Sequence, residues 1–347
     1  MEAKLFFFKN YMQNENVEYI RIKNAIENNN LTKVGYDLFE DKQELIELLK
    51  NDELKYSNQS MCDRVIQDVY NNTEVEELKE IIKCSYVGFL QTDKMGASAW
   101  RQFYDGSFLT VIGENTYFYL DEIGEIMVTK YLKSIEGIVK NPINYEVIDK
   151  LLNININEKD IDKKESEFYE LIKKLEGISN FDDDYVRLSC EVLDVALAFV
   201  IGHEYGHHIL KHLKNDNINM ELNINDDKFK NIFNEINELN DRCKKELDAD
   251  MFAIGFVCEY LSKYNDRGIS TLQMSGILVA IIFLAIGSKN LSVNSDSHPS
   301  VQTRYYFILQ WVEKIYGSSI INKMKDIMKW FCEDSGYCKW EEQWWDL

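Results

Sequence analysis

Apolar positions recur along most of the chain with the period of an α-helix. Residues 38–52 and 61–83 place apolar side chains three and four positions apart, which is typical of amphipathic helices. The same spacing predicts helices near 123–139, at 144–152 and at 160–176. The asparagine-rich stretch 213–240 is expected to begin as a loop and to end as a helix. The chain is therefore expected to be predominantly helical.

One short region departs from this helical pattern. Residues 107–112 and 116–120 are rich in β-branched and aromatic types, and 113–115 contain a glycine and an asparagine between them. This composition predicts a β-hairpin. Together with the helices, it indicates an α+β fold with a small β-sheet. We divide the chain into an N-terminal, mostly helical region of unknown role, 1–90, and a larger domain, 91–347.

Two helical segments are predicted to be buried. Residues 186–212 are apolar on nearly all sides between Val195 and Ile201, as expected of a helix inside the core. Residues 277–287 form the most apolar stretch, but they fall short of the roughly 20 residues that a membrane-spanning helix needs. The apolar run after Met1 is too short for the core of a signal peptide. We therefore expect no membrane span.

Charge and cysteine content narrow the function classes. The formal net charge is -20, and such a surface repels nucleic-acid phosphates and anionic lipids. The seven cysteines are scattered and form no Cys-x-x-Cys pair, which favours a reducing compartment over a secreted disulfide framework. The sequence thus predicts a cytoplasmic protein that binds neither nucleic acid nor membranes.

The candidate chemistry begins with a His-Glu-x-x-His motif. His203 and His207 are four positions apart and so lie on one face of the predicted buried helix. Two imidazoles placed this way can bind one Zn²⁺, with Glu204 beside the metal as a general base. Such a site performs the attack of water on a carbonyl group.

The neighbours of the motif carry further information. Gly206 costs about 1 kcal/mol of helix stability relative to alanine, which indicates that another group approaches the helix closely there. His208 and His212 have the same spacing as the ligand pair but no glutamate after the first of them. They point about 100° away from the motif histidines, and we interpret them as polar residues on the helix surface.

A third metal ligand is predicted downstream. Glu246 and Asp250 are four residues apart at the start of an apolar helical stretch. Glu246 would complete a His₂Glu site, the number of protein ligands usual for catalytic zinc. Asp250 would accept the outer N–H of a ligating histidine and hold its ring in place. Glu221 is a weaker alternative ligand.

These motifs resemble those of the gluzincin metallopeptidases. Residues 246–250 are similar to the later helix motif of the family that contains the CAAX prenyl endopeptidases and the bacterial heat-shock membrane peptidases. That family often has a His-Pro pair followed by an arginine, and this chain has His298, Pro299 and Arg304. The resemblance implies a zincin-like fold and an oxyanion stabilised by His298 or Arg304. Pro299 itself fits the first turn of a helix.

The resemblance covers roughly residues 190–310 and is incomplete. The membrane spans of the better-known members are missing, and their Asn-Ala-x-Ala edge strand has only a faint echo in residues 96–100. The soluble Lit-type phage-exclusion peptidases are an alternative relative.

The predicted function is a zinc-dependent endopeptidase with one Zn²⁺ per chain, acting on a protein or peptide substrate. One alternative is a latent metallopeptidase toxin or phage-defence effector that cleaves one specific cellular protein, released by a regulatory protein partner. Another is a non-catalytic interaction protein. The aromatic C-terminal tail is expected to pack on its own core.

Overall fold

The computed structural model describes residues 2–7, 58–90, 96–100, 102–134, 183–210, 239–264, 271–287 and 291–334. The predicted helices at 38–52, 144–152 and 160–176 lie outside these residues. So do residues 211–238 of the asparagine-rich stretch, with Glu221 and His212, and the tail beyond residue 334. What the sequence predicts for these segments stays a prediction.

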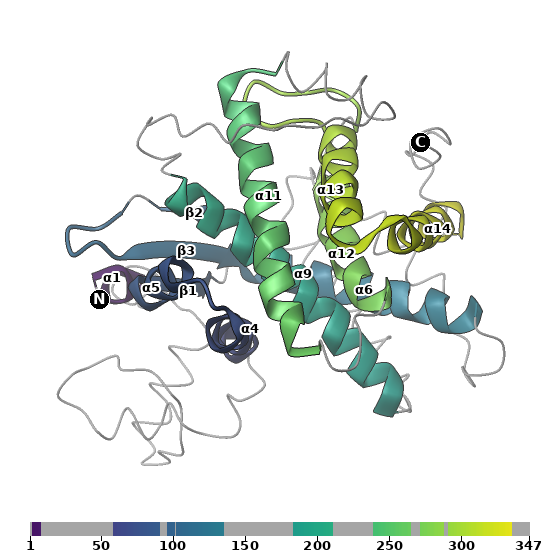
Figure 1. Cartoon of the computed structure of the whole chain (residues 1–347), viewed down its shortest axis with the longest axis horizontal. Coiled ribbons are helices and arrows are strands. Elements are labelled where there is room, and N and C mark those ends of the chain that lie inside the picture. Colours follow the sequence, from purple (N-terminus) through teal and green to yellow (C-terminus); the bar gives the residue numbers. More distant parts are fainter. Residues whose placement is uncertain are drawn as a thin grey trace, which may run out of the picture.

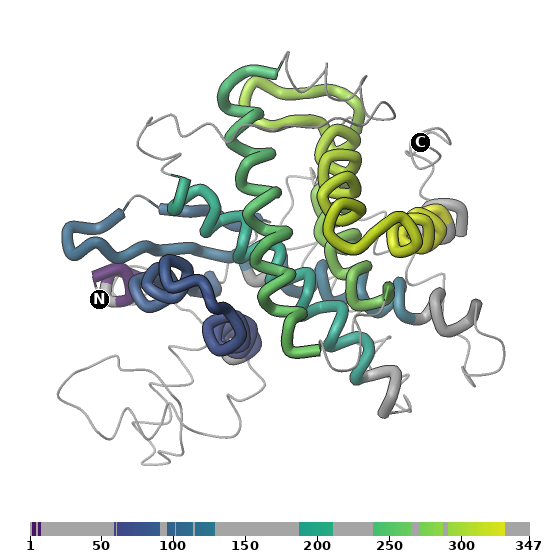
Figure 2. The backbone as a smooth tube through the Cα atoms, in the orientation of Figure 1, coloured from purple at the N-terminus to yellow at the C-terminus, as the bar shows by residue number. Residues whose placement is uncertain are grey.

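The described part is predominantly helical, with a small three-stranded sheet, as expected of the predicted α+β class. Figures 1 and 2 show the helices gathered around α9, with the sheet at one side. In chain order the main elements are α1 (Glu2–Phe7), α4 (Asn58–Asn72), α5 (Glu76–Cys84), β1 (Ser85–Leu90), β2 (Ala97–Ala99), β3 (Phe108–Gly113), α6 (Glu114–Ser134), α9 (Asp183–Ile209), α11 (Asp241–Leu261), α12 (Thr271–Gly287), α13 (Val301–Tyr316) and α14 (Ser318–Asp334).

The sheet has the strand order β1-β3-β2. β1 pairs in parallel with β3, and β2 pairs antiparallel with β3 on its other side, with Ala97 opposite Ile112 and Ala99 opposite Thr110. Among the described residues, β2 has no strand on its outer side. It therefore offers a row of backbone groups to an extended chain.

The predicted hairpin is half wrong. Its first strand is confirmed as β3, but residues 116–120 belong to α6. Tyr117, Leu120 and Ile123 are buried, and their three-residue spacing is that of a helix face. β3 finds its parallel partner in β1 instead. The single helix predicted at 61–83 is in fact α4 and α5, separated at residues 73–75.

α9 forms the centre of the core. It packs against α11, α12, α6 and α4, and Figure 1 shows α11 crossing it. Its residues from Val195 to Phe199 are at most 2% exposed, as predicted for a buried helix. The apolar stretch 277–287 is likewise confirmed as a buried helix, the second half of α12. No helix in the described part of the chain has the length and apolarity needed to cross a bilayer.

Two glycines let α11 approach α9 closely. A Cβ atom on Gly202 would lie 2.9 Å from Ala253 Cα, and one on Gly206 would lie 2.9 Å from Ala249 Cα. The close approach expected from Gly206 is thus the backbone of α11. Because lower numbers on α9 face higher numbers on α11, the two helices run in opposite directions. This register sets Glu246, one turn before Ala249, beside the motif histidines.

The division of the chain at residue 90 stays a prediction. β1, which ends at this position, pairs with β3 beyond it. α4 is also joined to the helical core, because Arg64 Nη2 lies 2.5 Å from Asp194 Oδ1 on α9. The other carboxylate oxygen of Asp194 accepts a hydrogen bond of 2.9 Å from Tyr260 on α11.

Candidate metal centre and cleft

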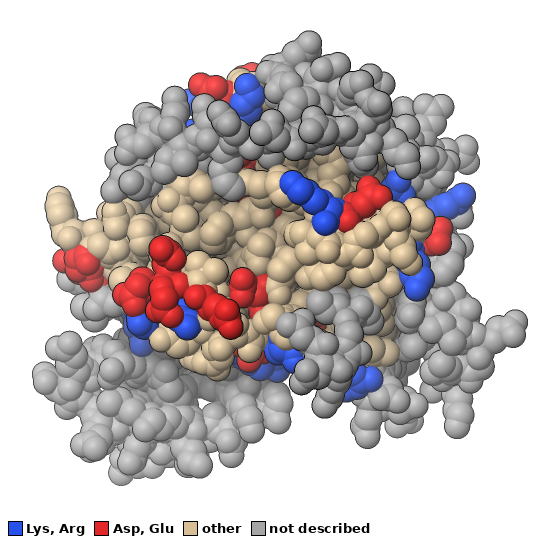
Figure 3. Space-filling view, viewed as in Figure 1, with Lys and Arg blue, Asp and Glu red and all other residues tan. Residues whose placement is uncertain are grey.

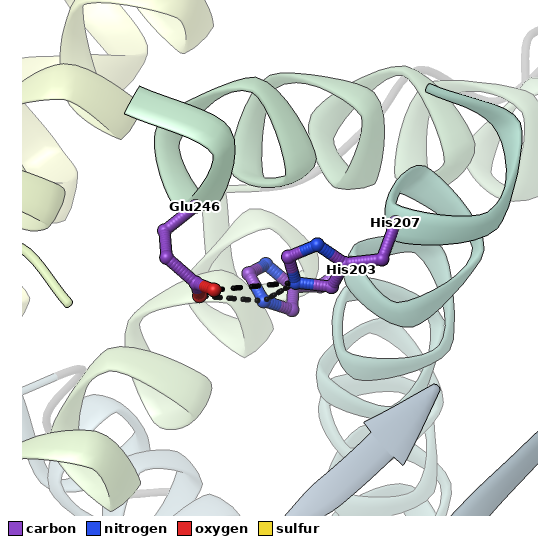
Figure 4. A group of neighbouring side chains, drawn as sticks. All are labelled: His203, His207 and Glu246. Carbon is purple, nitrogen blue, oxygen red and sulfur yellow. Dashed lines mark hydrogen bonds and ion pairs between the residues drawn. The ribbon is translucent and has the colours of Figure 1, made fainter. Parts of the chain in front are cut away.

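The two motif histidines and Glu246 meet between α9 and α11. Figure 4 shows both imidazoles projecting from one helix toward the carboxylate on the other. The Nε2 atoms of His203 and His207 are 3.2 Å apart. Glu246 Oε2 lies 3.3 Å from His203 Nε2, and Glu246 Oε1 lies 3.5 Å from His207 Nε2. The three side chains could hold a metal ion.

The spacing of these donor atoms fits a tetrahedral ion. Ligand bonds of about 2.0–2.1 Å place neighbouring donors of a tetrahedron about 3.3 Å apart. The three observed separations, two of which involve different oxygens of Glu246, lie within about 0.2 Å of that value. The sequence predicted this set of three from residue spacing and from the three protein ligands usual for catalytic zinc, and the structure brings all three together.

Asp250 contacts the outer ring nitrogen of His203, and Arg304 in turn contacts Asp250. Asp250 is fully buried, and its Oδ1 lies 2.9 Å from His203 Nδ1, so the ring's Nε2 faces the other donors. Arg304 donates to both oxygens of Asp250, from Nε at 2.8 Å and from Nη2 at 2.5 Å. Although burial raises the pKa of Asp250, the charge of Arg304 and the hydrogen bond to His203 hold it below its usual range. The carboxylate therefore stays ionised.

The ligand residues also shift one another's pKa values. Burial alone lowers the pKa of His203, but hydrogen bonds to Asp250 and Glu246 outweigh it and raise the pKa to about 9. Burial raises the pKa of Glu246, but the hydrogen bond and charge of His203 and the charge of His207 bring it to about 2. A metal ion at this centre would displace the proton of His203, so its affinity rises with pH.

Glu204 lines the same cleft as the two histidines and Glu246. It is 7% exposed, and its carboxylate accepts a hydrogen bond from the backbone N–H of Ala99 at the end of β2. Burial, the largest cause, and the charge of Glu246 raise its pKa to about 7, against the opposing charge of His203. A carboxyl group with a pKa near neutrality can both take and release a proton in water.

The centre opens into a cleft of about 510 Å³. One wall is β2 with Thr116 at the start of α6, and a second is formed by α9 and α12. The first turn of α11 and His298 complete it. Residues 96–100, which are weakly similar to the edge-strand motif, thus contain a strand that lines the cleft. The contribution of α12 was missed, because its uniform apolarity indicates burial and marks no cleft-facing side.

His298 lies at the mouth of this cleft on the loop before α13. Its Nε2 is 3.9 Å from Glu246 Oε2, and its side chain is 59% exposed. A tight turn holds it, because Ser295 Oγ accepts from His298 N at 2.8 Å and Ser295 N donates to His298 O at 2.9 Å.

Pro299 does not lie in the first turn of α13 as predicted. Ser300 is the N-cap, and its side chain accepts from Thr303 N.

The prediction for His208 is wrong. Its residue is only 5% exposed, and the ring packs against Phe108 with the centroids 4.8 Å apart. Its Nε2 lies 3.4 Å from Thr110 Oγ1 of β3. A position 100° from the ligand pair would face solvent on an isolated helix, but the sheet covers that side of α9. Burial lowers the pKa of His208 to about 4.

This buried imidazole predicts acid sensitivity of the fold. A depressed pKa contributes stability that is complete above the unfolded value of about 6.5 and is lost as the pH falls toward about 4. Between pH 7 and pH 5 we expect a loss of about 2 kcal/mol from this group. Denaturant unfolding of the wild type and of His208→Gln at both pH values measures it. An equal pH dependence in the two proteins would contradict the assignment.

Comparison with known proteins finds a stretch similar to peptidases that contains most of the cleft lining, but not β2 or Thr116. A peptidase family model matches residues 159–322, just under half of the chain. The family is described as Peptidase U49. The matched range contains the motif helix, Glu246, Asp250, His298 and Arg304, and the match supports a proteolytic function. No curated protein and no solved structure matches the chain.

Proposed function

We propose that the protein is a zinc-dependent endopeptidase that binds one Zn²⁺ per chain. The single observation that carries this proposal is the near-tetrahedral spacing of the donor atoms of His203, His207 and Glu246 beside a buried glutamate. Two imidazoles and one carboxylate form a donor set typical of catalytic zinc, which keeps a fourth position for water or substrate. The similarity to a peptidase family supports the peptide bond as the target.

When bound, zinc would supply Lewis acidity and lower the pKa of a water molecule toward about 7. Glu204 takes the proton of the attacking water and delivers it to the nitrogen of the leaving amine. The hydrogen bond from Ala99 N–H holds this carboxylate at the junction of β2 and the centre. Its burial raises its pKa to about 7 and so suits it to both halves of the transfer.

The remaining residues position the substrate and the ligands. The outer edge of β2 accepts an extended segment, whose backbone continues the sheet past Glu204. His298 donates to the carbonyl oxygen as negative charge develops on it, since it lines the cleft near Glu246. Arg304 gives two hydrogen bonds to Asp250, which supports a role in holding His203 rather than in contacting the substrate.

Metal analysis of the purified chain tests the proposal. We expect about one zinc per wild-type chain, and loss of the metal in His207→Ala and Glu246→Ala because only two donors remain. Chelation should abolish cleavage of protein substrates, and added Zn²⁺ should restore it. Glu191→Gln on the same helix, whose side chain bonds Arg187 and Gln273, is the control and should retain zinc and activity.

The same experiment separates the alternatives. A non-catalytic interaction protein would be purified without stoichiometric zinc and would be unchanged by the ligand substitutions. A latent peptidase specific for one cellular protein would hold zinc but leave generic substrates intact. Comparing the proteins cleaved in cells that express the wild type with those in cells that express a ligand variant would identify that target.

A further inference from the structure

The two ends of the cleft differ in chemistry. At one end, Phe199 and Val200 of α9 face Ala280, Phe283 and Leu284 of α12. This set defines an apolar pocket. Phe199 and Val200 lie four and three residues before His203, so they occupy the same face one turn away from the centre. Ala280, Phe283 and Leu284 share a face of α12 in the same way.

The other end carries positive charge. Arg242 and Lys245 lie among the first five residues of α11 and line the cleft. Arg242 precedes Glu246 by four residues, so it occupies the same face one turn away. Its side chain is exposed, and Glu246, the carboxylate one turn away, pairs with the two motif histidines. A guanidinium group in this position is available to a carboxylate on a bound chain.

The opposite directions of α9 and α11 place these features on opposite sides of the centre. Gly206 packs on Ala249 and Gly202 packs on Ala253, so moving back along α9 corresponds to moving forward along α11. Phe199 precedes His203 by four positions, and Arg242 precedes Glu246 by four positions. Because the two helices run in opposite directions, Phe199 and Arg242 lie on opposite sides of the metal centre. Each lies about 6 Å from its ligand along its helix at 1.5 Å per residue. In this register Glu246 lies opposite position 209 of α9, six positions or about 9 Å beyond His203. A segment that bridges Phe199 and Arg242 therefore spans roughly 21 Å, or six to seven residues at about 3.3 Å each.

We propose that the cleft selects extended protein segments with a bulky apolar side chain on one side of the cleaved bond and a carboxylate on the other. The apolar side chain enters the apolar pocket, and the carboxylate pairs with Arg242. The inference rests on the proposed function, because it specifies the substrate of that site.

The net charge of the protein does not oppose this preference at short range. The chain carries -20 overall, and Figure 3 shows acidic side chains gathered over α5, where Glu76 and Glu77 lie. At physiological ionic strength, charges farther away than about 8 Å are largely screened. A carboxylate bound in the cleft therefore responds mainly to Arg242 and its immediate neighbours.

A matched set of peptides tests the proposal. Each twelve-residue peptide carries leucine or alanine at one position and glutamate or lysine six or seven residues away, on either side. In the wild type, replacing leucine with alanine should lower kcat/KM roughly 10-fold or more. Replacing glutamate with lysine, in the preferred order, should lower it roughly 5-fold. Peptide binding to Glu204→Gln, followed by fluorescence anisotropy, should show the same order of preference without turnover.

Variants assign each preference to its end of the cleft. Arg242→Glu should reverse the choice between glutamate and lysine, while Lys244→Glu, the same charge change at a neighbour that does not line the cleft, should leave it intact. Leu284→Ala should shift the apolar preference toward phenylalanine and tryptophan, and Ala280→Leu should shift it toward alanine.

The outcomes distinguish the two levels of the proposal. If the zinc-loaded wild type cleaves the peptides at rates that do not depend on either residue, the peptidase stands and this inference is overturned. If Arg242→Glu and Lys244→Glu change the charge preference equally, Arg242 is not the recognition site and the inference is also overturned. If the wild type neither binds zinc nor cleaves any substrate, the proposed function itself fails.

Discussion

Replacing Glu204 with glutamine is expected to lower kcat roughly 10²–10⁴-fold while zinc stays bound, because that is the usual contribution of general acid–base catalysis. The amide has nearly the same size as the carboxylate, and its oxygen can still accept the hydrogen bond from Ala99 N–H. It cannot accept a proton from water. The loss should therefore appear in kcat, with little change in KM.

Zinc content and kinetics measured on the same preparation make this result decisive. Glu191→Gln applies the same chemical change on α9 at a residue that does not line the cleft, and it should behave like the wild type. Glu204→Asp keeps the charge but draws it back by one methylene, so an intermediate kcat is expected. Wild-type turnover by Glu204→Gln would show that another group takes the proton.

The motif helix could be predicted from the sequence because its information is local. Four-residue spacing alone places His203 and His207 on one face, and the apolar run before them indicates burial. Glu246 and Asp250 form a second local pattern. The need of a catalytic metal for a third ligand joined the two patterns, and a resemblance to a known family agreed with this set. In the structure Glu246 and Asp250 lie 3.3 Å and 2.9 Å from the ring nitrogens of His203.

The sheet and the cleft walls depend on contacts that no local pattern encodes. β1 and β3 are parallel and more than fifteen residues apart, so no turn signal marks their pairing. His208 shows the same limit, because its burial comes from β3 packing on a side of α9 that looked polar. The cleft-facing side of α12 could not be predicted from the sequence either, because an all-apolar helix has no polar face to mark it.

The helix register that unites the two patterns predicts a large effect of Gly206→Ala on zinc binding. The new Cβ would lie 2.9 Å from Ala249 Cα, a backbone atom that cannot turn aside, so α11 must move. Glu246 lies three residues before Ala249 and moves with it. Because metal sites tolerate only about 0.2 Å, we expect zinc affinity to fall at least about 10-fold. Competition with a chromogenic chelator measures it.

Gly255→Ala separates this steric effect from the intrinsic preference of a helix for alanine. Gly255 lies on the exposed side of α11, and a Cβ atom added there would meet nothing within 4 Å, so alanine should stabilise the fold by up to about 1 kcal/mol. Gly206→Ala also benefits from the higher helix propensity of alanine, but its methyl group overpacks the core and lowers the free energy of unfolding by about 1–3 kcal/mol. The two substitutions should therefore differ in zinc affinity and in the sign of their effect on unfolding free energy. Equal zinc affinities would show that the close approach of the helices does not set the position of Glu246.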